Sequence, residues 1–452
     1  MHTITEVTGP LAEKALSYRF ETLPDDVVGL TKQCILDWFG VTMAGVAEPV
    51  HERLFRTECQ EGPGPGAATI VGRPGRYTPQ QAAIVNGTTS HALDYDDVNL
   101  SISGHPTAVV FSALLGLAES RGKSGRELIA AFVAGYETSC RIGRLVAPDH
   151  MGRGYHATGT ICVFGAAAAC AHLLGLGNEQ TRMVLGLAGT MSAGLKAAFG
   201  TMAKPLHAGL AARNGLLAAM LVSQGFDGPR SIFEHDMGFA VTHSADFDVS
   251  AALDEPARGF HIRNNLFKYH ASCFGTIATL ECIREMKKGA PLEPDSVRGV
   301  VIRADRTVDR ICNLQSPASA MEAKFSLRLA AAYALLDIDT GIAENYNDAL
   351  VVRDDVVALR DLVEVQLVDG WPPMQASVEI ETHDGRRSSA TVDAGVAATD
   401  LDTQGERLLK KFLDLGRPGF GEERCQALAD YIDRFDQKEH LHDLGAVIAP
   451  PA

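Results

Sequence analysis

No uncharged apolar run in the sequence is convincingly long enough to cross a membrane. The stretch that comes closest, GTICVFGAAAACAHLLGLG, contains His172 and consists largely of Gly and Ala where a spanning helix would use Leu. The first twenty residues contain no basic segment followed by an apolar one, so no signal peptide is predicted. We therefore expect a soluble cytoplasmic protein with no membrane partner.

Basic charge is also scarce. The 452 residues include 41 Lys and Arg against 56 Asp and Glu, a formal net charge of −15. A nucleic-acid-binding protein needs a basic face that displaces counterions, and this composition argues against that class. A small anionic ligand is not excluded, because the local charge of a site decides such binding.

Cysteine pairs and cofactor motifs are missing as well. The nine cysteines show no C-x-x-C pair and no zinc-finger spacing, and several lie in apolar surroundings, which favours reduced core thiols. The sequence has no Walker loop, and GLAGTMSAG does not follow a strand, so it is no dinucleotide-binding turn. We expect no cofactor.

The spacing of apolar and polar residues changes along the chain and divides it into segments of different texture, that is, of helical or strand-like periodicity. Up to about Gly225, segments such as 24–45, 124–146 and 177–200 have apolar residues at three- and four-residue steps, which predicts long helices. Further on, SVRGVVIRAD alternates like a strand, 319–337 is helical, and 377–393 has the pattern of a hairpin around Asp384-Gly385.

These textures predict a mainly α protein with three segments. Residues 1–258 form an all-helical domain, 259–398 form a smaller α+β domain, and the helices of 399–452 complete the first domain.

Titratable residues gather in HALDYDDVNLSISGHP. A helix over residues 88–98 would place His91, Asp94 and Asp97 on one face, with Asp96 pointing elsewhere. The glycine before His105 breaks any helix and puts this histidine on a loop that can fold back. We expect Asp94 to orient His105 and raise its basicity, and Asp96 and Asp97 to be structural. The residue types also suit a metal, but no second ligand cluster supports one, so we expect no metal.

Three further stretches carry candidate residues. His156 lies at a predicted helix start, where free N–H groups favour anions. Lys204 precedes a proline, which pushes its backbone toward extended geometry, and His207 opens the next helix. That stretch alone fits a lysine that points into a cavity and a surface lysine equally well.

The stretch NLFKYHASC, at the junction of the two textures, contributes Lys268, His270 and Cys273 as hinge or cleft residues. A nucleophilic Cys273 would need a paired base that nothing local supplies, so we favour a structural role for it. Together the candidate residues suit a small polyanion. Lys204 would hold its carboxylate and the histidines would exchange protons.

The ordered motifs HALDYDD, GHP, GYHATGT, KPLHAGLAARNG, FKYHASC and EAKFSL resemble the MmgE/PrpD family. This family includes 2-methylcitrate dehydratase, cis-aconitate decarboxylase and iminodisuccinate epimerase. The resemblance implies a large helical domain with an inserted α+β lid domain, a homodimer, and no need for a metal or an organic cofactor.

Carried over by motif, the resemblance implies that Asp94, His105, His156 and Lys204 are catalytic. Four neighbouring residues are expected to bind substrate: His91, His207, Lys268 and His270. Two positions depart from the decarboxylase branch, which has a threonine at Val98 and a histidine at Ile277. His270 could substitute for the second, although its spacing differs.

The sequence leaves three functions open. The first is a cofactor-independent lyase, a dehydratase or decarboxylase of a small di- or tricarboxylate, in which His105 and His156 share the proton transfers. The second is an epimerase of a dicarboxylate such as an aspartate-derived imino acid. The third is a catalytically silent homologue.

Overall fold

The structure, a computed structural model, is mainly α-helical and divides into two compact units. It describes residues 5–60, 66–289, 291–441 and 443–448. The ends of the predicted first domain and of the C-terminal segment, residues 1–4 and 449–452, therefore lie outside the described residues, and residues 1–4 are also the start of the N-terminal stretch in which no signal peptide is predicted.

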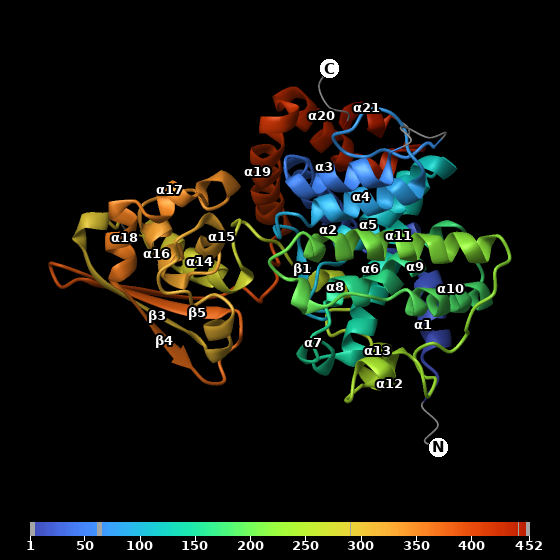
Figure 1. The fold of residues 1–452 in the computed structure, drawn as a ribbon, viewed down its shortest axis with the longest axis horizontal. Helices are drawn as coiled ribbons and strands as arrows, with labels where there is room; N and C mark the ends of the chain where they lie inside the picture. Colours follow the sequence, from blue (N-terminus) through green and yellow to red (C-terminus); the bar gives the residue numbers. More distant parts are fainter. Residues whose placement is uncertain (1–4, 61–65, 290, 442, 449–452) are drawn as a thin grey trace. The chain divides into compact units, whose positions relative to one another are not determined.

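The first unit comprises Met1–Phe267 and Thr399–Ala452. Its helices are α1 (Thr8–Ser17), α2 (Asp25–Gly45), α3 (Pro49–Glu58), α4 (Pro79–Ser90), α5 (Pro106–Arg121), α6 (Gly125–Val146), α7 (Asp149–Gly152), α8 (Ala157–Thr160), α9 (Cys162–Leu173), α10 (Asn178–Thr190), α11 (Ala203–Ser223), α12 (Phe239–His243), α13 (Val249–Leu253), α19 (Leu401–Phe420), α20 (Glu422–Asp433) and α21 (Leu444–Ile448). Although α19 is far from α2 in the sequence, the two helices pack side by side (Figure 1).

The centre of this unit is formed by α4, α5, α6, α9 and α11, which pack against one another. Small residues allow the close approach: a Cβ on Gly209 of α11 would lie 2.2 Å from the backbone oxygen of Ile84 in α4. Gly87 and Gly209 face each other at this crossing, so the end of α4 lies beside the first turns of α11. That crossing brings His91, Lys204 and His207 into one region.

Two predicted boundaries differ from the structure. The predicted helix 177–200 ends at Thr190, and beyond it Gly194 and Gly200 adopt positive φ angles of 151° and 81° that are incompatible with a continued helix. Residues 259–267 belong to the first unit. The reason is that His261 and Ile262 donate backbone hydrogen bonds to the Glu137 carboxylate of α6.

The second unit is Lys268–Ala398. It contains α14 (Phe274–Gly289), α15 (Ala320–Ala323), α16 (Leu327–Leu335), α17 (Asp348–Val351), α18 (Asp354–Asp361), β3 (Val297–Asp305), β4 (Val363–Val368), β5 (Gln375–Thr382) and β6 (Arg387–Asp393). The strand order is β4-β3-β5-β6, with β3 and β4 parallel. The predicted hairpin is confirmed as β5 and β6, whereas the predicted helix 319–337 is interrupted between Ala323 and Leu327.

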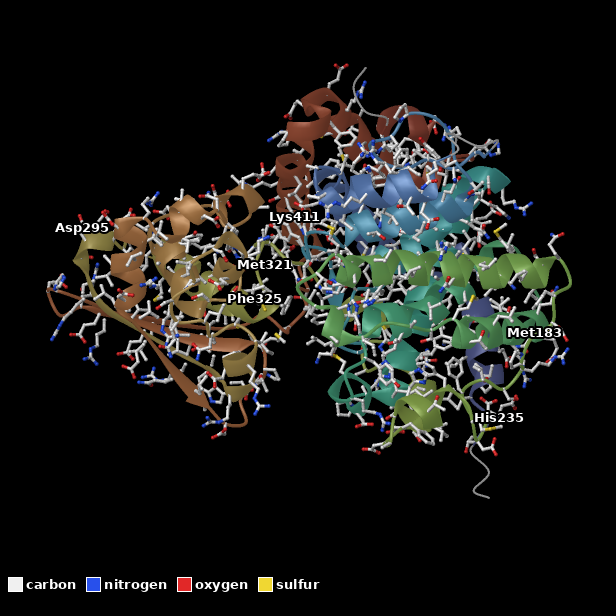
Figure 2. All side chains as sticks on the ribbon, in the orientation of Figure 1. Met183, His235, Asp295, Met321, Phe325 and Lys411 are labelled. Atoms are coloured by element: carbon white, nitrogen blue, oxygen red, sulfur yellow. The ribbon has the colours of Figure 1, made fainter. Side chains whose placement is uncertain are left out.

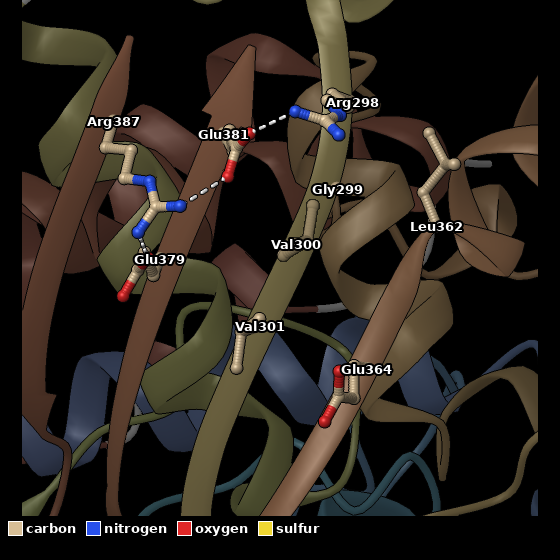
Figure 3. Close-up of a pocket in the computed structure, with 9 residues that line it drawn as sticks. All are labelled: Arg298, Gly299, Val300, Val301, Leu362, Glu364, Glu379, Glu381 and Arg387. Carbon is tan, nitrogen blue, oxygen red and sulfur yellow. Dashed lines mark hydrogen bonds and ion pairs between the residues drawn. The ribbon is translucent and has the colours of Figure 1, made fainter. Parts of the chain in front are cut away.

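The helices of the second unit lie along one face of this sheet (Figure 1). Charged side chains on the strands border a surface hollow of about 400 Å³ (Figure 3). There Arg298 pairs with Glu381, while Arg387 pairs with Glu379 and Glu381. Because these charges neutralise one another, this face has the character of an ordinary solvated sheet surface.

The structure bears on the expectations of reduced core cysteines and of no membrane-spanning helix. All nine cysteines are described, and each is a free thiol; all except Cys273 are buried. Among the described residues, no helix combines the length and apolar character that a membrane span requires.

Candidate active site

A tight turn follows α4 and carries the acidic motif. A capping box starts the helix: Thr78 Oγ1 accepts from the Gln81 N–H at 3.2 Å, and Gln81 Oε1 accepts from the Thr78 N–H at 3.1 Å. The helix ends at Ser90, and Asp94 adopts a left-handed backbone with φ of 52°. The helix over 88–98 that would place His91, Asp94 and Asp97 on one face therefore does not form. The chain turns instead.

The turn places Asp96 between two imidazole rings. Its two carboxylate oxygens each lie 3.0 Å from His91 Nδ1, and Oδ2 lies 3.1 Å from His105 Nδ1. Burial raises the pKa of Asp96, but its electrostatic attraction and hydrogen bonds to the two rings prevail and hold that pKa well below its ordinary value. Asp96 is therefore ionised. Nothing in the sequence spacing marked it above Asp94.

Asp94 connects His105 to Lys204. Its Oδ1 lies 3.4 Å from His105 Nε2 and 2.9 Å from Lys204 Nζ. Lys204 is part of α11, so the extended geometry predicted for it is wrong. Pro205 is tolerated because the first turn of a helix does not use its own N–H groups. The Lys204 ammonium also lies 5.5 Å from the centre of the Phe199 ring.

His156 and His207 complete the cluster. His156 immediately precedes α8, as the sequence predicts, and its Nδ1 lies 3.0 Å from His207 Nδ1. The His156 ring is 5.8 Å from that of His91, which is 4.5 Å from that of His105. Burial, reinforced by the neighbouring imidazoles and Lys204, lowers the pKa of His156. This ring is neutral at neutral pH and can accept a proton.

Asp97 points away from the imidazoles. Its Oδ2 accepts a hydrogen bond from Thr107 Oγ1 at 2.7 Å and lies 3.9 Å from the Cys34 thiol. Burial, together with the charge of Asp37, raises the pKa of Asp97 well above its ordinary value. Asp97 is therefore a neutral acid that supports the turn through its hydrogen bond with Thr107.

A buried ion pair anchors the same turn. Lys411 of α19 (Figure 2) donates to Asp37 Oδ1 at 2.6 Å and to the backbone oxygen of Tyr95 at 2.8 Å. Both charged side chains are almost fully buried, and the Lys411 ammonium lies 3.9 Å from the centre of the Tyr95 ring. Helix α19 thus fixes the turn that carries Asp94 and Asp96.

The second unit contains the remaining predicted residues. Lys268 is buried, and Cys273 is only partly exposed. His270 Nδ1 lies 2.6 Å from Thr340 Oγ1 and its Nε2 lies 3.1 Å from Glu281 Oε1. Both ring nitrogens are thus engaged inside this unit, which favours a structural role for His270 over the predicted substrate binding. Ile277 is buried in α14 and belongs to the apolar packing.

Val98, which stands where the decarboxylase branch has a threonine, belongs to the first unit. Val98 lies in β1 (Val98–Asn99), where it pairs with Leu266 of β2 (Asn265–Leu266). Its side chain is buried and offers no group that could exchange a proton or donate a hydrogen bond.

His91 should make stability fall on acidification. Burial lowers the pKa of folded His91 to about 4, against an ordinary value of 6.5. Between these values the unfolded chain binds the proton and the folded chain does not, so stability is lost as the pH falls from 6.5 toward 4. We expect His91 to contribute roughly 2 kcal/mol of loss between pH 7 and pH 5.

Urea unfolding at pH 7 and pH 5 checks this expectation. The variant His91→Gln should show a smaller difference between the two pH values than the parent protein. The exposed His235 (Figure 2) provides the control, because His235→Gln should leave the difference unchanged. Equal acid sensitivity in all three proteins would contradict the expectation.

Comparison with known proteins gives two family matches. The MmgE/PrpD N-terminal domain matches residues 9–252, and the MmgE/PrpD C-terminal domain matches residues 270–437. The chain belongs to the MmgE/PrpD family. This confirms the resemblance that the ordered motifs indicate.

Several relatives within the MmgE/PrpD family are similar to this chain. The cis-aconitate decarboxylase-like protein oryM of Aspergillus oryzae is 30% identical over 294 residues, 61% of each chain. Cis-aconitate decarboxylase of Aspergillus terreus is 26% identical over 95% of this chain and 93% of its own length. The human cis-aconitate decarboxylase is 26% identical over 78% and 74%. These relatives support an enzymatic role for this MmgE/PrpD protein.

One group of side chains has the composition of a metal site. His91, Asp94, Asp96 and His105 bring one ligand-type atom each within 4.8 Å of one another. The carboxylates already have partners, however: Lys204 lies against Asp94, and two imidazoles share Asp96. A divalent cation here would be repelled by the ammonium of Lys204 and would compete with it for Asp94. The arrangement suits proton transfer better than metal binding.

Proposed function

We propose that this protein is a cofactor-independent lyase that removes water or CO2 from a small di- or tricarboxylate. The observation that carries the proposal is the Lys204–Asp94 ion pair beside a cluster of histidines that share the Asp96 carboxylate. The similarity to cis-aconitate decarboxylases gives the class of substrate.

In this proposal Lys204 binds the substrate and two histidines transfer protons. Lys204 has three N–H donors, so it can hold Asp94 and a substrate carboxylate together. In dehydration a proton leaves the carbon next to that carboxylate, whereas in decarboxylation CO2 leaves this carbon and a proton later replaces it. In both cases negative charge grows on the oxygens of the remaining carboxylate, and the fixed ammonium stabilises this charge. His105 and His156 share the proton transfers, because imidazole rings can both accept and donate protons and the neutral His156 ring is available as the acceptor.

A second candidate is an epimerase of a dicarboxylate such as an aspartate-derived imino acid. The buried apolar side chains of Val98 and Ile277 favour it, because neither can donate a proton where the decarboxylase branch has a polar residue. An epimerase needs one group to remove the α-proton and another to return it on the opposite face, and several histidines are present for this.

Proton NMR in D2O distinguishes these functions. We expect a panel of citrate-, aconitate- and aspartate-derived acids to include one that loses water or CO2. Solvent exchange at the α-carbon without net conversion would favour the epimerase instead. Neither conversion nor solvent exchange with any acid of the panel would favour a catalytically inactive homologue.

Turnover should not depend on a metal. Because Lys204 already supplies the positive charge beside Asp94, prolonged dialysis against EDTA should leave kcat unchanged. The measurement compares dialysed and mock-dialysed enzyme. Loss of turnover that one divalent ion restores would overturn this expectation and bring the His91, Asp94, Asp96 and His105 group back as a metal site.

The family resemblance adds two proposals about assembly. The second unit acts as a lid domain, and the enzyme is a homodimer. Light scattering coupled to size-exclusion chromatography should give about twice the chain mass of 48.2 kDa. Elution at the monomer mass at assay concentration would contradict the second proposal.

A further inference from the structure

Asp96 is the most buried acid in the cluster, and it contacts two histidines by the same ring atom. Its carboxylate lies 3.0 Å from His91 Nδ1 and 3.1 Å from His105 Nδ1, and it is 1% exposed. By contrast, Asp94 is 41% exposed in its side chain and is engaged by Lys204. The two carboxylates therefore differ in their burial and in the side chains that they contact.

We propose that Asp96 is the positioning residue of the site: its hydrogen bond fixes His91 with the proton on Nδ1, and its charge holds the His105 ring beside it. This inference rests on the proposed proton-transfer function and assigns Asp96 the orienting role that the sequence gives to Asp94. It also gives His91 a place in the proton-transfer machinery, beside His105.

Hydrogen-bond chemistry carries the argument. An ionised carboxylate only accepts, and a neutral imidazole has a single N–H, so a neutral ring bonded to Asp96 must carry its proton on Nδ1. In His91, which makes this hydrogen bond, Nε2 then has a free lone pair, whereas His105 Nε2 lies 3.4 Å from Asp94 Oδ1. His91 Nε2 is buried and has no hydrogen-bond partner among the described residues. Burying an unpartnered basic nitrogen costs free energy, and such a group is typically retained where the reaction uses it.

The shared carboxylate also links the two rings. His91 and His105 lie with their centroids 4.5 Å apart at an angle of 60°, so one acid holds two imidazoles in different orientations. A proton taken up by either ring is stabilised by the same negative charge. Asp96 thereby makes the two histidines a coupled pair.

The test is the variant Asp96→Asn, read by ¹⁵N NMR of protein labelled at histidine. Asparagine has the same shape, but its amide accepts from one ring and donates to the other. If the amide N–H faces His91, Nδ1 of this ring becomes an acceptor and its proton moves to Nε2; if the amide oxygen faces it, the Nδ1–H keeps only a neutral acceptor. In either case we expect the ¹⁵N signals of His91 to change and kcat to fall about 10²-fold, with a smaller change in KM.

The matched control is Asp97→Asn. Asp97 is the next residue and is equally buried at 1% exposed, but it contacts Thr107 and Cys34 and not an imidazole. This variant should keep both tautomers and nearly all activity. The signals of the two histidines are assigned with His91→Gln and His105→Gln.

Two results would overturn the proposal. The first is a parent protein in which neutral His91 carries its proton on Nε2, which can be measured even if no Asp96 variant folds. The second is equal loss of activity in both asparagine variants with unchanged ¹⁵N signals of His91, since that describes a structural acid only. The tautomer measurement needs no substrate, so a change of tautomer without turnover of any acid separates failure of the proposed function from failure of this inference.

Discussion

We expect the replacement of Lys204 with methionine to lower kcat/KM by about 10³-fold, because charge that develops on a substrate carboxylate loses its fixed cation. Methionine keeps the length and apolar stem of the side chain and removes only the ammonium group. Both kcat and KM should change, since Lys204 binds the carboxylate in the ground state and binds it more strongly in the transition state. Steady-state kinetics with the acid that the parent enzyme converts measures the effect.

The fold should survive this change. Lys204 pairs with Asp94, whose side chain is 41% exposed, and a solvated ion pair of this kind contributes no more than about 1 kcal/mol. The control Lys196→Met removes a lysine from the preceding loop that lies 3.5 Å from the Met151 backbone oxygen, and it should be fully active. Lys204→Arg should recover part of the binding, because it restores the charge.

Lys204 should not form a Schiff base. A nucleophilic lysine needs a free amine aimed at a carbonyl carbon, whereas Lys204 Nζ forms an ion pair with the Asp94 carboxylate at 2.9 Å. Treatment with borohydride during turnover should therefore leave Lys204 unmodified in the mass spectrum. A reduced substrate adduct on this residue would show that its role is covalent.

The second large effect concerns stability. Lys411→Met should reduce the free energy of unfolding by about 3–5 kcal/mol, because it leaves Asp37 buried without its cation. Burial already raises the pKa of Asp37 against the opposing pull of Lys411. In the variant Asp37 must take up a proton to fold, so the loss should be smaller at low pH, where that proton is available. Urea unfolding at two pH values measures both effects.

Lys410→Met is the matched control. Lys410 is the preceding residue of α19 and pairs with Asp414 at 2.5 Å on the surface, with 69% of its side chain exposed. Its loss should cost less than about 1 kcal/mol. The double variant Asp37→Asn with Lys411→Met should recover part of the stability, since no unpaired charge then remains. If Lys411→Met is as stable as Lys410→Met, the buried pair does not anchor the turn.

Local sequence patterns predict much of this protein. The helices at 24–45 and 124–146 are confirmed as α2 and α6, and the hairpin around Asp384-Gly385 is confirmed as β5 and β6. Each follows from side-chain periodicity and a recognisable start or turn within a short window. The motif order likewise identified the family.

What the sequence could not predict depends on tertiary contacts. The left-handed backbone at Asp94 decides which acid faces the histidines, and no spacing rule foretells a positive φ at an aspartate. Asp96 therefore looked structural, although the repeated acid in DYDD was the one signal that could have drawn attention to it. The role of Lys411 depends on a partner far away in the chain, and α19 alone reads as an amphipathic helix.

The Lys411–Asp37 pair also bears on synthesis of the chain. The ribosome must complete α19 before the turn after α4 can acquire its anchor, whereas the second unit is contiguous and can assemble as soon as Lys268–Ala398 has emerged. At bacterial or eukaryotic elongation rates of about 5–20 residues per second, the helices before Phe267 wait many seconds for their last partner. During that interval, the face of α2 that α19 later covers is open to chaperones.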